Sequence, residues 1–87
     1  MNSADWPEEF EKLLRSYLPL LRADAPLAPD TLLADLGLDS LSTVGLLVDV
    51  EDFFCVQLPD DALTPDTFAS AISLWSVVAR QRHLAAE

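Results

Sequence analysis

The chain has 87 residues, of which 51% are hydrophobic, and its fifteen acidic and five basic residues give a formal charge of −10. This length predicts a single domain over residues 1–87, and the apolar content excludes a disordered chain. Cys55 is the only cysteine, so a disulfide within the monomer is excluded, and no apolar run approaches the ~20 residues of a membrane span. Because the first residues also lack the pattern of a secretory signal, we expect a monomeric, soluble protein of the cytoplasm.

The charges are distributed unevenly along the chain. No lysine or arginine lies between Arg22 and Arg80, whereas ten acids lie there: Asp24, Asp30, Asp35, Asp39, Asp49, Glu51, Asp52, Asp60, Asp61 and Asp66. The basic surfaces that bind nucleic acid or anionic lipid are therefore absent from this interval, and we expect neither as a partner. The negative electrostatic field of these acids favours association with basic surfaces on other proteins.

The first predicted helix covers residues 7–21. Pro7 suits the first helical position, and the acids that follow it suit the positive end of the helix dipole. Apolar residues recur at steps of three and four, as expected for one buried stripe: Trp6, Phe10, Leu13, Leu14, Tyr17, Leu18 and Leu21. We expect Pro19 to kink or fray the last turn.

A long connection, residues 22–39, follows this helix. A structureless loop of that length is unusual in a compact domain, and its leucines predict that it is held on the core: Leu27, Leu32, Leu33, Leu36 and Leu38. Asp30 could cap a single helical turn over residues 31–34. Gly37 would let the chain turn sharply just before the next helix.

The second predicted helix covers residues 40–54, with Asp39 as its N-cap. One side carries Leu41, Val44, Leu47, Val48 and Glu51, and Leu46, Val50, Phe53 and Phe54 widen the apolar surface. The opposite side carries Ser42, Gly45, Asp49 and Asp52.

A short turn within residues 55–63 precedes the last predicted helix, which Asp66 or Thr67 could cap. Its predicted buried stripe is Phe68, Ala71, Ile72, Trp75, Val78 and Ala79, and it ends in the polar stretch RQRH. No segment alternates as a strand does. The sequence therefore predicts an all-α fold, a small four-helix bundle of three main helices and one short helix, with a long loop between the first and the second.

Ser40 is the candidate functional residue. A nucleophilic serine needs a base, but the only histidine, His83, lies in the polar tail, and one cysteine with one histidine cannot form a zinc site. As the first helical residue after Asp39, Ser40 would expose its hydroxyl beside unpaired N–H groups and the positive dipole end, which suits a phosphodiester. The residues alone favour the simpler interpretation that Asp39 and Ser40 only cap the helix.

The stretch DLGLDSL, residues 35–41, resembles the acyl carrier protein family, as do the amphipathic segment TVGLLVDVEDFF that follows it and the turn LPDD at 58–61. This similarity extends over nearly the whole chain. It implies the acyl-carrier type of bundle, with a 4′-phosphopantetheine arm that a phosphopantetheinyl transferase attaches to Ser40 from coenzyme A. Asp39 is then the motif neighbour of the modified serine, and an acyl group is held on the arm as a thioester.

The resemblance also implies a partner surface on the second helix, where family members present acids to basic residues of their enzymes. Asp49, Glu51 and Asp52 keep that character, whereas Ser42 and Gly45 replace acids that many fatty-acid carriers have. This departure favours a narrower set of partners. Leu41, Val44 and Leu46 would border the arm and the first atoms of its cargo.

The function that the resemblance implies is that of a discrete carrier protein, not an enzyme, that shuttles an acyl or aminoacyl group between biosynthetic enzymes. The expected pathway is polyketide or related natural-product biosynthesis, including antibiotics, with a loading ligase and an acyltransferase or ketosynthase as partners. Two alternatives stay open. One is an aminoacyl or peptidyl carrier of a non-ribosomal or D-alanyl-type pathway, and the other is an acidic helical adaptor that carries nothing.

Overall fold

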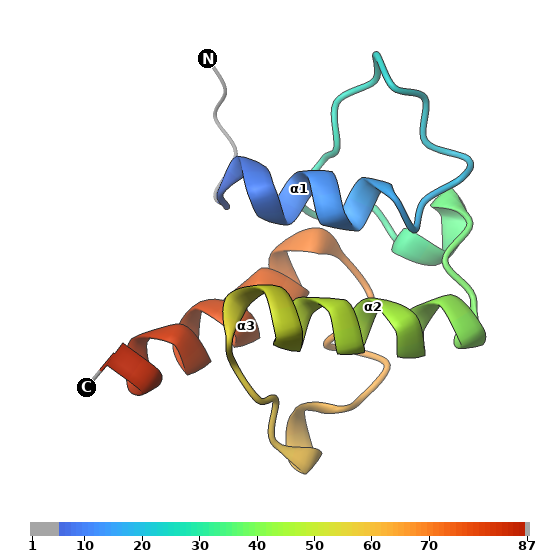
Figure 1. Ribbon diagram of the computed structural model, residues 1–87. Helices are drawn as coiled ribbons and strands as arrows, with labels where there is room; N and C mark the ends of the chain where they lie inside the picture. Colours follow the sequence, from blue (N-terminus) through green and yellow to red (C-terminus); the bar gives the residue numbers. More distant parts are fainter. Residues whose placement is uncertain (1–5, 87) are drawn as a thin grey trace.

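The computed structural model describes residues 6–86, and every regular element within that range is helical (Figure 1). The helices are α1 (Glu8–Arg15), α2 (Ser40–Phe54) and α3 (Ala71–Ala86), and two short 3₁₀ helices, η1 (Leu33–Leu36) and η2 (Asp60–Ala62), lie in the connections. The all-α bundle with a long first connection is thus confirmed. None of the helices in residues 6–86 has the length and apolar character needed to cross a membrane.

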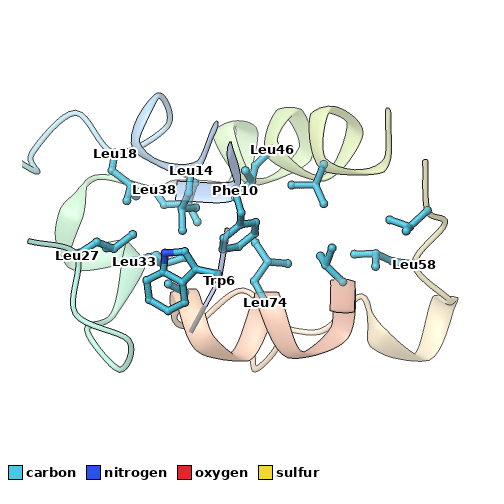
Figure 2. Packing of buried hydrophobic residues seen from close by; sticks show 14 residues of the cluster. Trp6, Phe10, Leu14, Leu18, Leu27, Leu33, Leu38, Leu46, Leu58 and Leu74 are labelled. Carbon is cyan, nitrogen blue, oxygen red and sulfur yellow. The ribbon is translucent and has the colours of Figure 1, made fainter. Parts of the chain in front are cut away.

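The core lies between α1, α2 and α3, with Phe10 at its centre. In Figure 2 the ring of Phe10 lies among Leu14, Leu46 and Leu74, all of which are fully buried. Its ring centroid is 5.0 Å from that of Trp75. The predicted placement of both tryptophans on the core is confirmed, because Trp6 is buried and Trp75 is half-buried against the same cluster.

Helix α1 is shorter than the predicted helix over residues 7–21. Proline lacks an N–H, and its ring collides with the carbonyl of the residue four positions earlier; for Pro19 that residue is Arg15, where α1 ends. The carbonyl of Arg15 instead accepts from the N–H of Leu18 at 3.0 Å. The chain leaves the helix through tight turns, yet Leu18 still reaches the core.

The long connection is held by one side chain from α1. Arg15 pairs with Glu11 at 2.9 Å and donates to the carbonyls of Arg22 and Ala25 at 3.2 and 2.6 Å. Burial alone would raise the pKa of Glu11, but hydrogen bonds from Trp6 and Arg15 outweigh it and lower that pKa. One guanidinium therefore fixes where the loop crosses the end of α1.

The leucines of this connection behave largely as predicted. Leu27, Leu33 and Leu38 are buried, whereas Leu32 is 53% exposed. The predicted turn at 31–34 with an Asp30 cap is wrong, because η1 begins at Leu33 and has no side-chain cap. A tertiary contact accounts for the difference: the N–H of Leu33 donates to the carbonyl of Ala69, at the entrance to α3, at 2.8 Å.

Helix α2 has the predicted bounds, but its sides are used differently. Leu46 and Val50 are fully buried. By contrast, three residues that the sequence grouped on one apolar side are exposed, Leu41 by 85%, Val44 by 60% and Val48 by 56%. A helix that is apolar on several sides has no single face selected by its periodicity, so the packing of its neighbours decides which side is buried.

Helix α3 begins later than predicted. Neither Asp66 nor Thr67 caps it; the Ser70 hydroxyl accepts from the N–H of Ser73 at 3.3 Å, and the Ser73 hydroxyl accepts from the N–H of Ser70 at 3.1 Å. This reciprocal arrangement satisfies two N–H groups at the helix start. The helix continues through position 83, and the His83 side chain lies outside the described residues.

Candidate functional site

Ser40 is the first residue of α2, and its side chain is exposed. Asp39 is the N-cap, as predicted: its carboxylate accepts from the N–H of Ser42 at 2.7 Å, and its carbonyl accepts from the N–H and hydroxyl of Thr43 at 2.8 and 2.7 Å. The hydrogen bond from Ser42 lowers the pKa of Asp39. Asp39 is thus occupied with the helix start, and the Ser40 hydroxyl faces solvent.

Gly37 directs the chain into this helix start. Its φ is 104°, in the left-handed region, where it ends η1. A Cβ at this position would lie 2.8 Å from Cγ of Pro19. The N–H of Leu20, beside that proline, donates to the carbonyl of Leu36 at 3.0 Å. Glycine is required here both for its backbone conformation and for the close approach of the 19–20 segment.

An open groove of about 740 Å³ lies beside Ser40. Its walls come from the N-terminal half of α2, from η1 and its flanks, and from the segment that leads into α3. It is lined by Leu32, Ala34, Leu38, Asp39, Ser40, Thr43, Val44, Leu47, Leu63, Thr64, Pro65, Phe68 and Ala69. Val44 was expected to border the arm, whereas the wall from residues 63–69 was not predicted, because its approach to α2 is a tertiary contact.

Two of the expected partner residues make internal contacts. A Cβ at Gly45 would lie 3.2 Å from the ring of Tyr17, so this ring packs against the surface of α2 at Gly45. Glu51 is half-buried, and its carboxylate accepts from the N–H of Leu58 at 2.9 Å. Leu46, expected near the arm, is fully buried in the core, so that expectation is wrong.

The remaining expected partner residues reach the surface. Leu41 is 85% exposed, Asp49 and Asp52 are exposed, and Ser42 is half-buried. Asp49 also accepts a hydrogen bond from the Tyr17 hydroxyl, and that bond raises the pKa of Tyr17. Gly45, Tyr17 and Asp49 thus form one contact between the turn after α1 and the side of α2, which no helical periodicity indicates.

The outward side of α2 is an apolar stripe formed by Leu41, Val44 and Val48. These residues follow at steps of three and four, so their side chains lie in one row along the helix. The stripe begins next to Ser40, and Asp52 lies one further turn along the same helix. A surface row of apolar residues next to acids has the composition of a protein-binding surface.

The residues around Ser40 fit a phosphopantetheine group. The hydroxyl is accessible for a phosphodiester bond, the N-terminus of a 15-residue helix stabilises a phosphate anion, and the groove offers apolar contacts beside it. The ionised carboxylate of Asp39 has no hydrogen to donate to a phosphate. Its contribution to the site is the hydrogen bond with Ser42 that caps α2.

Comparison with known proteins agrees with this geometry. The family model described as "Phosphopantetheine attachment site" matches residues 9–73, a range that includes Ser40. Aminoacyl carrier protein 1 of Bradyrhizobium diazoefficiens is 33% identical over 70 residues, covering 80% of this chain and 78% of that protein. Aminoacyl carrier protein 2 of the same organism is 32% identical over 69 residues, covering 79% and 78%.

Solved structures of carrier proteins have the same fold. A carrier protein bound to Bradyrhizobium japonicum glycine:[carrier protein] ligase with an analogue of glycyl adenylate superposes with a TM-score of 0.68 at 32% identity, covering 84% of this chain and 95% of that one. The glycylated carrier protein in complex with this ligase gives 0.64 at 30% identity, covering 79% and 93%. The carrier protein of Agrobacterium tumefaciens, bound to an engineered form of the ligase with AMP, gives 0.70 at 26% identity, covering 80% and 93%.

The family match covers residues 9–73, most of the chain, and the first relative is 33% identical over 70 residues, which is 80% of the chain. The chain therefore belongs to the family of carrier proteins that bear a covalently attached 4′-phosphopantetheine.

Proposed function

We propose that Ser40 is the residue to which the arm is attached and that this protein carries an amino acid, loaded by an adenylate-forming aminoacyl ligase. The observation that supports the first part is the exposed Ser40 hydroxyl at the first position of α2, directly after the Asp39 cap. The relatives support the second part, because two are aminoacyl carriers and three solved ones are bound to an aminoacyl ligase.

Each residue at this site has a distinct part in the proposed function. Ser40 provides the oxygen of the phosphodiester, and the N-terminus of α2 stabilises its negative charge. Asp39 keeps that terminus in place through Ser42. When bound, the arm supplies the thiol that holds the cargo as a thioester. Flexible attachment raises the effective concentration of the cargo at each partner enzyme.

The cargo that we propose differs from the one that the sequence favoured. A polyketide pathway, with its acyltransferase or ketosynthase, finds no support among the relatives, whereas the aminoacyl alternative is consistent with all of them. Among the expected partners, the transferase and the loading ligase are the two that we retain.

We place the partner surface on the apolar stripe of Leu41, Val44 and Val48, together with Asp52. Partners with apolar anchors surrounded by basic residues complement this surface. Ser42 and Asp49 border it, whereas Gly45 and Glu51 act through the contacts that they make inside the molecule. The resemblance implied that partner enzymes recognise the acids of the second helix. In the surface proposed here, partners bind the apolar stripe as well as the acids beside it.

Intact-mass measurement tests the attachment. We expect the protein, incubated with coenzyme A and a promiscuous phosphopantetheinyl transferase, to gain the mass of one phosphopantetheine. The Ser40→Ala variant should gain nothing, and the matched Ser42→Ala variant should be modified as fully as the unchanged protein. A wild-type chain that stays unmodified under these conditions would favour the acidic adaptor that carries no group.

The cargo is tested on the modified protein with glycine, ATP and the Bradyrhizobium glycine:[carrier protein] ligase as the probe. We expect the added mass of one glycyl group, removable by hydroxylamine, which cleaves thioesters. If aminoacyl ligases leave the arm empty while an acyltransferase loads it from an acyl donor, the aminoacyl assignment is wrong and the attachment still stands.

A further inference from the structure

Tyr17 attaches the chain that follows α1 to the side of α2. Helix α1 ends at Arg15, so Tyr17 lies in the turns after it. A Cβ at Gly45 would lie 3.2 Å from the Tyr17 ring, and the Tyr17 hydroxyl donates to the Asp49 carboxylate. Gly45 and Asp49 are four residues apart and therefore lie on the same side of α2. One side chain thus fixes where the chain after α1 rests on α2.

The residues that come next contact the turn that leads into α2. A Cβ at Gly37 would lie 2.8 Å from Cγ of Pro19. The N–H of Leu20 donates to the carbonyl of Leu36 at 3.0 Å. Because Gly37 precedes Ser40 by only three residues, a shift of either contact changes how the chain enters α2.

The two sets of contacts are coupled through a short and stiff stretch of chain. Leu18 is fully buried in the core, and the ring of Pro19 fixes its own φ. Few free backbone dihedral angles therefore separate the Tyr17 side chain from the Leu20 N–H. Movement of the Tyr17 ring away from α2 would be transmitted to the turn, because the chain between them cannot absorb it.

The attachment reaction depends on the position of the Ser40 oxygen. This oxygen forms a bond to the phosphorus next to the pantetheine of coenzyme A, the bond from that phosphorus to adenosine 3′,5′-bisphosphate breaks, and the hydroxyl proton is released to solvent. A misplacement of about 1 Å, caused by a change far from the reacting atoms, can slow such a step about 100-fold. Tyr17 contacts α2 more than one turn beyond Ser40, so it can act on this step only through position.

We propose that Tyr17 is a positioning residue for attachment of the arm. Its contacts with α2 hold the residues after α1 against the turn at Gly37, and this keeps the Ser40 hydroxyl where the transferase modifies it. The inference rests on the proposed attachment at Ser40 and adds to it, since neither the serine motif nor the apolar stripe includes Tyr17.

Single-turnover kinetics with coenzyme A and a promiscuous phosphopantetheinyl transferase test this role. Tyr17→Ala removes the ring and the hydrogen bond, whereas Tyr17→Phe keeps the ring. At saturating transferase we expect the rate constant to fall about tenfold in Tyr17→Ala and about threefold in Tyr17→Phe. The half-saturating transferase concentration should stay within about twofold, because the apolar stripe is unchanged. An unchanged rate constant in Tyr17→Ala would refute the positioning role, and a loss confined to half-saturation would assign Tyr17 to partner binding instead.

Leu13→Ala is the matched control for a general loss of stability. Like Tyr17, Leu13 is a half-buried residue packed against the core. This variant should unfold more easily than the wild type, yet its single-turnover rate constant should be unchanged at a temperature where both are folded. If Leu13→Ala slows attachment as much as Tyr17→Ala does, loosening of the bundle explains the effect and the specific role of Tyr17 is wrong.

Amide hydrogen exchange follows the same contacts without any enzyme. The N–H of Leu20 should exchange about tenfold faster in Tyr17→Ala than in the wild type, because its bond to the Leu36 carbonyl depends on the Tyr17 contacts. Leu13→Ala should change this exchange much less. Equal exchange of the Leu20 N–H in Tyr17→Ala and the wild type would show that the two sets of contacts are independent, contrary to the proposal.

The proposed function and this inference fail in different ways. If the wild type gains no arm, the attachment at Ser40 is wrong, whatever the exchange of the Leu20 N–H. If the wild type and Tyr17→Ala are modified at the same rate, the attachment stands and the positioning role does not.

Discussion

At the start of α2, Asp39 and Ser40 have different tasks. The Asp39 carboxylate is held by the N–H of Ser42, and this bond keeps its pKa below the usual 3.8. Ser40 has its hydroxyl in solvent. The order of the two residues matters. If a single residue both capped α2 and carried the arm, its side-chain oxygen would be bonded to the arm and would have to give up its hydrogen bond to the helix.

Substitution of Asp39 tests the cap and its dependence on pH. We expect Asp39→Ala to lower Tm by a few degrees, and Asp39→Asn, which also caps helices well, to lower it less. A depressed pKa means that the stabilisation is present above the unfolded-state value near 3.8 and is lost as the pH falls through the lower folded-state value. Thermal unfolding of both variants between neutral and acidic pH measures this. A Tm difference between wild type and Asp39→Ala that persists in full at the acidic end would contradict it.

Gly37→Ala tests the turn into α2. An L-residue at a φ of 104° is strained, and its Cβ would collide with Pro19 at 2.8 Å. We expect a loss of at least about 1–2 kcal/mol in the free energy of unfolding, measured by urea denaturation. Gly45→Ala is the matched control: its φ is not positive, and the Cβ contact with Tyr17 is 3.2 Å. Equal losses for the two variants would mean that the backbone conformation at Gly37 has no special cost.

At the scale of elements, the end of α1 determines how the long connection is placed. Pro19 ends the helix at Arg15, and the same arginine then binds the carbonyls of Arg22 and Ala25. This placement carries the chain to η1 and Gly37 and so to Ser40. A loop of this length needs such fixed points, because each ordered residue costs about 1–2 kcal/mol of conformational entropy.

Replacement of Arg15 tests this element. Arg15→Ala should reduce the free energy of unfolding by about 1–3 kcal/mol, because it breaks two hydrogen bonds to carbonyls and the pair with Glu11. Amide hydrogen exchange in residues 22–32 should increase at the same time. Arg22→Ala is the control, since its ion pair with Asp24 is largely exposed and contributes little. If both variants unfold alike and exchange is unchanged, Arg15 does not fix the loop.

At the scale of the whole molecule, the absence of bases from residues 23–79 gives the surface around Ser40 a negative field. Such a field accelerates encounters with basic partners and weakens as salt screens it. In the proposed function, the apolar stripe on α2 supplies the short-range contacts with partners that this field attracts. Charge would then govern how fast partners arrive, and the stripe would govern how well they fit.

Charge reversal at two exposed acids separates the docking surface from net charge. Asp52→Lys, on α2, should slow loading by the aminoacyl ligase about fivefold at low ionic strength, and the difference should shrink at high salt. Asp60→Lys changes the net charge equally but lies outside α2, at the start of η2, so we expect a much smaller effect. Initial rates of aminoacylation measure both. Identical rates for the two variants would mean that docking does not use this end of α2.

Much of the site could be predicted because its signals are local. Asp39 before Ser40, Gly37 before both, and the bounds of α2 all depend on caps and backbone preferences within a few residues. The predicted start of α3 failed because Asp66 and Ser70 both satisfy the local rule for a cap, and only Ser70 is placed to exchange hydrogen bonds with Ser73.

The sequence alone determined the helical class, the serine at the helix start and the acidic interval, since all three follow from the order of residues along the chain. Only the tertiary structure decided which side of α2 meets the core, that Tyr17 covers Gly45, and that residues 63–69 form one wall of an open groove beside Ser40. The physical reason is the same in each case. A helix with apolar residues on several sides gains similar free energy from burying any of them, so the choice depends on the shape of what packs against it.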